Sequence, residues 1–276
     1  MVSAEPQALH QSFLPKPGER AFVWKYSQSI GGRRPRHFHI EPELNLVVRG
    51  SATFGVGERF VQVSQGELLA FPTGQDHVLI EGSPDLYLYA IGLDPRYSTE
   101  VLGGRSEPVL PLHVELPPHE LAAICDRAGD IVDRSGAAQQ GAELWERIHW
   151  LGRRSVERSR RSNHVLTRRV LKLLDIAPEL GLEALANDLR ANSTELSRHF
   201  HRDLGMTLVR YRTRLRLLRF IRAVDCGERD LMATAIAAGF GSYSQCHRTF
   251  QAELGCAPRR FFRSEVRERM QLTYEG

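Results

Sequence analysis

The sequence predicts a multidomain α+β protein with an N-terminal β-barrel, a helical connector and an all-α C-terminal domain. In the C-terminal domain, two similar helix pairs are joined by one long helix. Short strand-like runs separated by Gly, Pro or Asp fill residues 44–93. The pattern R-x-F-x-x-[DE]-L-G occurs twice, at 198–205 and 248–255. Residues 1–149 hold 13 Lys and Arg against 19 Asp and Glu, whereas residues 150–276 hold 24 against 14.

This charge division predicts two domains, with a polyanion as the partner of the basic C-terminal half. The strand-like and helix-like patterns described below set the expected bounds at 1–112, 113–165 and 166–276. The apolar fraction of 42% and the charged fraction of 25% are ordinary for a globular protein. No run approaches the ~18 apolar residues of a membrane span, and the N-terminus lacks a basic-then-apolar secretion signal. We therefore expect a cytoplasmic protein with no membrane partner.

The N-terminal strands carry a candidate ligand set. The strand-like runs are LNLVVRG, ATFGVG, RFVQV, ELLAFP, HVLIEG and LYLYAIGL. Such repeated short strands are typical of a sandwich or barrel. His37, His39 and Glu43 share odd numbering, so on an extended strand they project to one side, and His77 begins a later run. Three histidines and a glutamate suit one divalent ion such as Zn, Fe, Mn or Ni. Alternatively, the same side chains line the pocket of a small-molecule effector.

The spacing of these residues resembles the two cupin motifs. Gly31, His37, His39, Glu43 and Gly50 match G-x5-H-x-H-x3-E-x6-G. Gly66, Pro72, Gly74 and His77 match the second motif, which usually ends in Asn where this chain has Glu81. The resemblance implies a cupin barrel over about residues 20–95. The basic run Arg33, Arg34 and Arg36 is interpreted as a solvated loop, with contact to an acidic effector as the alternative.

The connector has helical spacing of apolar residues. HELAAICDRAGDIVD and AELWERIHWLGRRSVERSRR each place apolar residues three and four apart. Two helices that pack on the barrel explain this pattern, and they could also form a homodimer seam. The run RRSVERSRRSN at 153–163 is interpreted as a mobile basic link.

Each copy of the repeated pattern ends a predicted helix-turn-helix unit. In the first, Asn192 caps a helix whose inward residues are Leu196 and Phe200. In the second, Ser242 is the cap, and Cys246 and Phe250 face inward. The outward residues are Thr194, Ser197, Arg198 and His201 in the first copy, and Tyr243, Ser244, Gln245, His247 and Arg248 in the second. Each helix presents a short polar and basic face that fits a DNA major groove.

A long helix is predicted between the two units. Residues 207–224 carry apolar residues at spacings of three and four. About 18 residues would span roughly 27 Å, and successive major grooves on one face of DNA lie about 34 Å apart. The helix could therefore place two reading helices in adjacent grooves. Its arginines are interpreted as mainly solvent-facing: Arg210, Arg212, Arg214, Arg216, Arg219 and Arg222.

Residues 166–263 resemble the DNA-binding domain of the AraC/XylS family of bacterial transcription regulators. The resemblance lies in STELSRHF, AIAAGFGSYSQCHRTFQAELG and APRRFFR. It implies that Thr194, Ser197 and Arg198 read bases, together with their counterparts in the second unit. It also fits the cupin barrel, because such regulators often carry one as a sensor. The family usually has a large aromatic residue where this chain has Cys246.

The sequence thus predicts a transcription regulator that binds a double-stranded DNA operator and senses a small molecule or metal. It is not expected to be an enzyme, because no phosphate loop or nucleophile elbow occurs. The alternatives are a metal-dependent cupin dioxygenase or isomerase with an appended DNA-binding module, and an architectural DNA-binding protein. The sequence does not decide between activation and repression.

Overall fold

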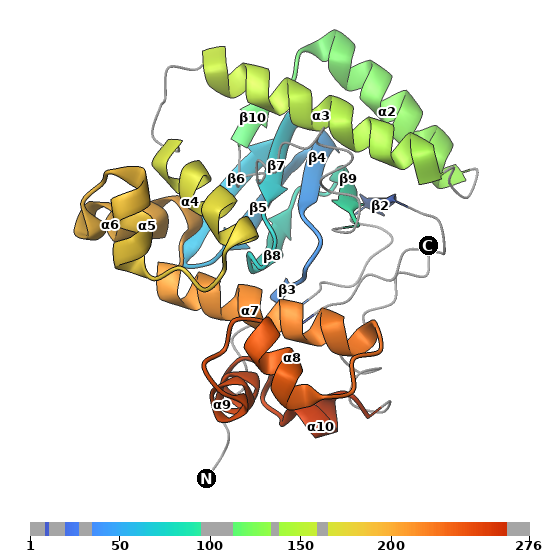
Figure 1. The fold of residues 1–276 in the computed structure, drawn as a ribbon. Helices are drawn as coiled ribbons and strands as arrows, with labels where there is room; N and C mark the ends of the chain where they lie inside the picture. The colour runs from blue at the N-terminus through green and yellow to red at the C-terminus, as the bar shows by residue number, and fades with distance from the viewer. Residues whose placement is uncertain are drawn as a thin grey trace.

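The computed structural model describes residues 9–10, 20–27, 35–94, 113–133, 138–158 and 165–263 (Figure 1). The strands are β1 (Leu9–His10), β2 (Ala21–Ser27), β3 (His37–Phe38), β4 (Glu43–Arg49), β5 (Ser51–Val56), β6 (Arg59–Ser64), β7 (Glu67–Phe71), β8 (His77–Gly82), β9 (Tyr87–Leu93) and β10 (His113–Glu115). The helices are α2 (Pro118–Asp133), α3 (Ala138–Arg158), α4 (Val165–Ile176), α5 (Leu182–Leu189), α6 (Ser193–Leu204), α7 (Leu208–Asp225), α8 (Leu231–Ala237), α9 (Tyr243–Leu254) and α10 (Pro258–Phe261).

The strands form two five-stranded sheets that enclose one apolar cluster. Their orders are β1-β3-β8-β5-β6 and β10-β7-β4-β9-β2. Phe54 and Val63 from the first sheet are buried in the same cluster as Leu69 and Leu88 from the second. The expected barrel is therefore built as two packed sheets, and all six runs expected to be strands are strands. Strand β2, which lies outside the six expected runs, pairs antiparallel with β9 at one edge of the second sheet.

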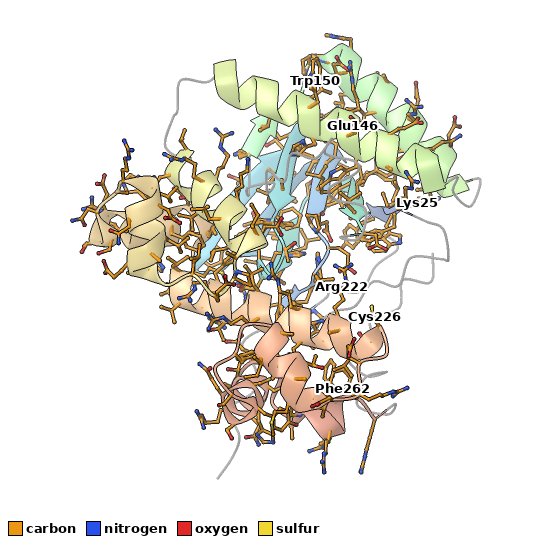
Figure 2. All side chains as sticks on the ribbon, in the orientation of Figure 1. Lys25, Glu146, Trp150, Arg222, Cys226 and Phe262 are labelled. Atoms are coloured by element: carbon orange, nitrogen blue, oxygen red, sulfur yellow. The ribbon has the colours of Figure 1, made fainter. Side chains whose placement is uncertain are left out.

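The connector helices cover the outer face of the second sheet, as expected (Figure 1). Trp145 and Ile148 of α3 are fully buried against this sheet. Trp150 is 43% exposed, and the Arg147 guanidinium lies 5.0 Å from its ring centroid. Figure 2 shows Trp150 and Glu146 on the side of α3 away from the sheet. This exposed side remains the predicted dimer seam.

The expectation of a mobile link at 153–163 is wrong for its first part. Helix α3 continues to Arg158, so residues 153–158 are helical. Arginine and glutamate are good helix formers, which explains why a charged run extends a helix begun by an apolar stripe. Residues 159–163 lie outside the described ranges.

The C-terminal half has two cores that share α7. The first core joins α4, α5 and α6 to the start of α7, and the second joins the rest of α7 to α8, α9 and α10. Leu196, Phe200, Cys246 and Phe250 are all fully buried, as expected. The smaller Cys246 is enclosed in a core rich in phenylalanine, where the Phe250 ring lies 5.8 Å from the Phe220 ring.

Local capping explains the ends of the two helices α6 and α9. Asn192 accepts hydrogen bonds from the amides of Thr194 and Glu195, and Ser242 accepts one from the amide of Gln245. Both helices end at a left-handed glycine, Gly205 with φ of 64° and Gly255 with φ of 69°.

The arginines of α7 do not face solvent as expected, and Arg214 contradicts the expectation most clearly. Arg214 is 0% exposed, and the other five are half-buried. Arg212 and Arg216 donate to the carbonyl of Glu179, while Arg219 donates to those of Leu174 and Asp175. These carbonyls follow or end α4, where orphan acceptors need donors. The positive charge on this helix therefore serves packing within the fold.

None of the helices in the described part of the chain combines the length and apolar character that crossing a bilayer requires.

Candidate ligand site and nucleic-acid interface

Three buried histidines meet between the two sheets. Strands β3 and β8 pair antiparallel with His37 opposite His77, and their ring centroids are 4.4 Å apart. His39 follows β3, and its ring centroid lies 5.1 Å from that of His77. One ligand atom from each of the three histidines lies within 4.8 Å of the others. The fold thus brings together residues 40 positions apart in the sequence.

Glu43 completes the predicted set from the first position of β4. Its Oε2 lies 3.3 Å from His39 Nε2, and its Oε1 lies 3.8 Å from His77 Nε2. Asn45 donates to Glu43 Oε1 at 2.6 Å and orients the carboxylate. All four residues predicted as ligands are therefore in one buried cluster, which we call the histidine cluster.

The second ring nitrogen of each histidine is fixed by a backbone carbonyl. Nδ1 of His37 lies 2.9 Å from the Pro35 oxygen, Nδ1 of His39 lies 2.7 Å from the Glu41 oxygen, and Nδ1 of His77 lies 3.1 Å from the Gln75 oxygen. A carbonyl only accepts, so each Nδ1 carries the proton and Nε2 is the atom left for a ligand. The buried Nε2 of His77 makes no hydrogen bond to any described residue.

The protonation states suit a metal ion. Burial lowers the pKa of His77 to about 4 and holds the pKa of His37 well below its ordinary value, so both rings are neutral at pH 7. Burial alone would raise the pKa of Glu43, but the hydrogen bond from His39 and the nearby imidazoles lower it to about 2. Burial also opposes charge on His39, but Glu43 outweighs burial and raises the pKa of His39. A bound ion would displace that proton, as ligand deprotonation requires.

Arg36 is neither in a solvated loop nor free for an acidic effector. Its Nη1 donates to Asp76 Oδ2 at 2.9 Å and to the Gly57 carbonyl at 2.9 Å. Both sequence expectations are therefore wrong for Arg36, because an internal carboxylate has taken its charge. Arg33 and Arg34 lie outside the described residues.

The predicted DNA-reading residues lie on the outer faces of α6 and α9. On α6, Thr194, Arg198 and His201 are exposed and Ser197 is half-buried. On α9 the exposed residues are Ser244, Gln245 and Arg248, and the half-buried ones are Tyr243 and His247. The side-chain oxygen of Gln245 accepts from the amide of Gly241 at 2.8 Å, which leaves its amide nitrogen for other contacts. His201 lies 3.7 Å from Glu58 of the β5–β6 turn.

In the described part of the chain, five charged residues are buried without having been expected to be: Glu41, Asp76, Asp94, Asp203 and Arg214. Arg214 lies three residues after Tyr211 and four before Leu218, so the helical period places it on the inward face. Glu41 shares the odd numbering of His39 and Glu43. Asp76 had no signal beyond its place beside His77.

These two halves define a class of protein: a ligand-binding sensor domain followed by a DNA-binding helix-turn-helix domain. A family model described as the AraC-like ligand binding domain matches residues 23–152, and one described as a helix-turn-helix domain matches residues 185–264. Together they span most of the chain, which belongs to the AraC family of transcription regulators.

Known proteins resemble the chain over most of its length. The HTH-type transcriptional activator RhaS of Salmonella agona is 24% identical over 245 residues, covering 82% of this chain and 86% of RhaS. RhaS of Salmonella typhimurium is 23% identical over the same shares. Among solved structures, ToxT from Vibrio cholerae O395 has a TM-score of 0.46 and 11% identity, covering 89% of this chain and 97% of ToxT.

Proposed function

We propose that this transcription regulator reads its DNA operator through the outer faces of α6 and α9. The nine predicted residues on these faces are exposed or half-buried, whereas the residues beneath them are fully buried. Arg198 and Arg248 hold equivalent places in the two units and suit the O6 and N7 acceptors of guanine. The curated relatives are activators, which supports activation as the output.

In the sensor half, the proposed effector site is the histidine cluster, which holds either a divalent metal or a small molecule. The observation that carries this is that Nδ1 of each histidine contacts a backbone carbonyl, while Nε2 of His39 and Nε2 of His77 lie 3.3 Å and 3.8 Å from oxygens of the buried Glu43 carboxylate. Zn, Fe, Mn and Ni all accept such nitrogen and oxygen donors. A bound ion would supply positive charge and open coordination positions for a carboxylate or hydroxyl of an effector.

Catalytic activity, dimerisation and cellular location complete the proposal. We assign no reaction to the cluster, since the relatives are named as activators and the predicted partner is DNA. The dimer seam along the exposed side of α3 and the cytoplasmic location remain predictions. The enzyme alternative would show itself as substrate turnover in the absence of DNA.

Metal content is the first test. Protein purified without an affinity tag or chelator is analysed by mass spectrometry for bound metal, beside the double variant His37→Ala, His39→Ala. Near-stoichiometric metal that is lost in the variant supports the metal site. Absence of metal from both proteins would make the cluster the wall of an organic effector pocket.

DNA reading is tested separately by selection from a random duplex pool. A regulator enriches one short sequence. Recovery of unrelated sequences with equal affinity would contradict sequence-specific reading and indicate an architectural protein.

A further inference from the structure

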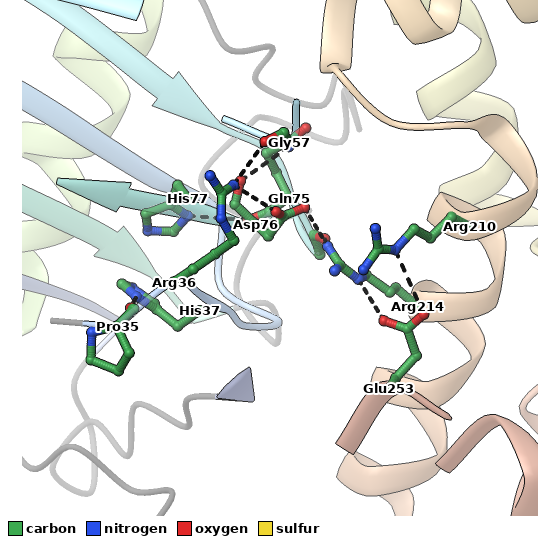
Figure 3. A network of polar contacts seen from close by, with 11 residues as sticks. Pro35, Arg36, His37, Gly57, Gln75, Asp76, His77, Arg210, Arg214 and Glu253 are labelled. Atoms are coloured by element: carbon green, nitrogen blue, oxygen red, sulfur yellow. Dashed lines mark hydrogen bonds and ion pairs between the residues drawn. The ribbon is translucent and has the colours of Figure 1, made fainter. Parts of the chain in front are cut away.

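Arg214 of α7 is a fully buried cation at the junction of the two halves of the chain. A buried charge is stable only with partners. Its partners come from both halves: Asp76 Oδ1 at 2.5 Å, the Gly74 carbonyl at 3.4 Å, Glu253 Oε2 at 3.1 Å, and the Phe38 ring, whose centroid lies 4.5 Å from the guanidinium carbon. Figure 3 shows this network reaching from Arg36 through Asp76 and Arg214 to Glu253.

Two of these partners are direct neighbours of cluster histidines. Phe38 stands between His37 and His39, and Asp76 precedes His77. Successive side chains of an extended chain point to opposite sides. The histidines therefore face the interior between the sheets, while Phe38 and Asp76 face α7. Phe38 is 0% exposed and packs in the core of the second helix-turn-helix unit.

The same junction holds the C-terminal ends of both proposed reading helices. On α9, Glu253 binds Arg214. At the end of α6, the Gly205 carbonyl accepts from the Glu58 amide at 2.8 Å, and the Asp203 carbonyl accepts from Arg59 at 2.8 Å. The turn that supplies Glu58 is itself tied to the junction, because the Gly57 amide donates to the Asp76 carbonyl at 3.1 Å.

We propose that Arg214 couples the histidine cluster to the two reading helices. A ligand bound in the histidine cluster fixes the backbone positions of His37, His39 and His77. The neighbouring residues Phe38 and Asp76 move with that backbone. Their contacts with Arg214 then change the position of α7, which carries both units. Breaking the Arg214–Asp76 pair would leave each of these buried charges with one counter-ion fewer, Glu253 for Arg214 and Arg36 for Asp76, so the junction favours discrete arrangements over gradual ones.

The proposal rests on the proposed effector site and DNA interface, and it has a thermodynamic consequence. Coupling between two sites is reciprocal. A ligand bound in the histidine cluster must therefore change the affinity for DNA by the same factor by which bound DNA changes the affinity of the cluster for that ligand. A typical factor is about 5- to 150-fold. Removing the Arg214 contacts should bring the factor close to one.

The linkage experiment measures Zn²⁺ affinity by chelator competition, with and without the duplex that the wild-type chain selects. The variant is Arg214→Met. Its matched control is Arg219→Met, on the same helix, because Arg219 bonds the Leu174 carbonyl within the C-terminal half. We expect wild type and the control to show the same several-fold coupling, and Arg214→Met to show none. Coupling retained in Arg214→Met, or absent from wild type, would overturn the proposal.

Hydrogen exchange on metal-free, DNA-free protein provides a second readout that needs neither ligand. Arg214→Met should speed exchange both at 37–39 and in α9, whereas Arg219→Met should leave 37–39 unchanged. Faster exchange confined to α7 would contradict the coupling, even if wild type binds no Zn²⁺ and the effector site itself is wrong.

Asp76→Asn serves where Arg214→Met does not fold. This substitution keeps the shape of the side chain and the backbone carbonyl of residue 76, which accepts a hydrogen bond from the Gly57 amide. We expect it, like Arg214→Met, to abolish the coupling and to speed exchange at 37–39 and in α9.

Discussion

Replacement of Gly57 by alanine tests whether the sensor turn packs on the first reading helix. Gly57 has φ of +56°, and a Cβ there would lie 2.3 Å from the Gly205 oxygen and 2.8 Å from the Leu204 oxygen. These are backbone atoms, so no side chain can rotate away. The turn must withdraw from α6.

The magnitude follows from the bonds that this withdrawal breaks. The Glu58 amide would lose the Gly205 carbonyl, and Arg59 would lose the Asp203 carbonyl. One neutral and one charged hydrogen bond are together worth about 2–4 kcal/mol. The left-handed backbone adds about 1–2 kcal/mol of strain for alanine. The lost bonds alone correspond to roughly 30- to 700-fold faster exchange of the Glu58 amide.

The assay is residue-resolved hydrogen exchange, with Gly66→Ala as the control. Gly66 also has a positive φ, of +84°, but the atom nearest to its added Cβ is Leu121 Cδ2 at 3.6 Å. Gly66→Ala therefore carries backbone strain without the clash, and the Glu58 amide should exchange at its wild-type rate. Equal rates at Glu58 in the two variants would refute the packing of this turn on α6.

Other substitutions test the two helix-turn-helix units. Phe200→Ala should destabilise the first unit by about 3–5 kcal/mol in urea denaturation, since the side chain is 0% exposed; a stable variant would mean that the helix face is misassigned. Asn192→Ala should cost about 1 kcal/mol in the same assay, because the amides of Thr194 and Glu195 lose their acceptor. Arg198→Ala or Arg248→Ala should weaken binding to the selected duplex by about 1–3 kcal/mol and relax base preference, as measured by fluorescence anisotropy. An equal loss on random duplexes would assign these arginines to phosphate.

The junction at Arg214 brings the β-rich sensor into direct contact with α7. Helix α7 serves as the shared strut of both units, and Figure 1 shows it lying beside β3 and β8. Phe38 and Asp76, which do not face the histidine cluster, are thereby in contact with Arg214 of α7. A short path of neighbouring residues is enough to connect the two proposed sites.

The sequence by itself determined the features that depend on local order. Helix caps at Asn192 and Ser242, glycine ends at 205 and 255, and the inward pair Leu196 and Phe200 follow from periods and short-range hydrogen bonds. The motif spacing also predicted that His37, His39, Glu43 and His77 lie together, but not by alternation along one extended strand, because His37 is on β3 of the first sheet and Glu43 is on β4 of the second.

Only the tertiary structure decided which charges are buried and what holds them. Arg214 and its partner Asp76 are 138 residues apart, so no local pattern joins them. Arg36 likewise shows no local sign of a partner, and the Asp76 carboxylate that binds it is 40 residues away in the sequence. A charged side chain enters a protein interior only where distant groups supply its hydrogen bonds and counter-charge. That supply depends on how the two halves pack together, and composition or period cannot specify it.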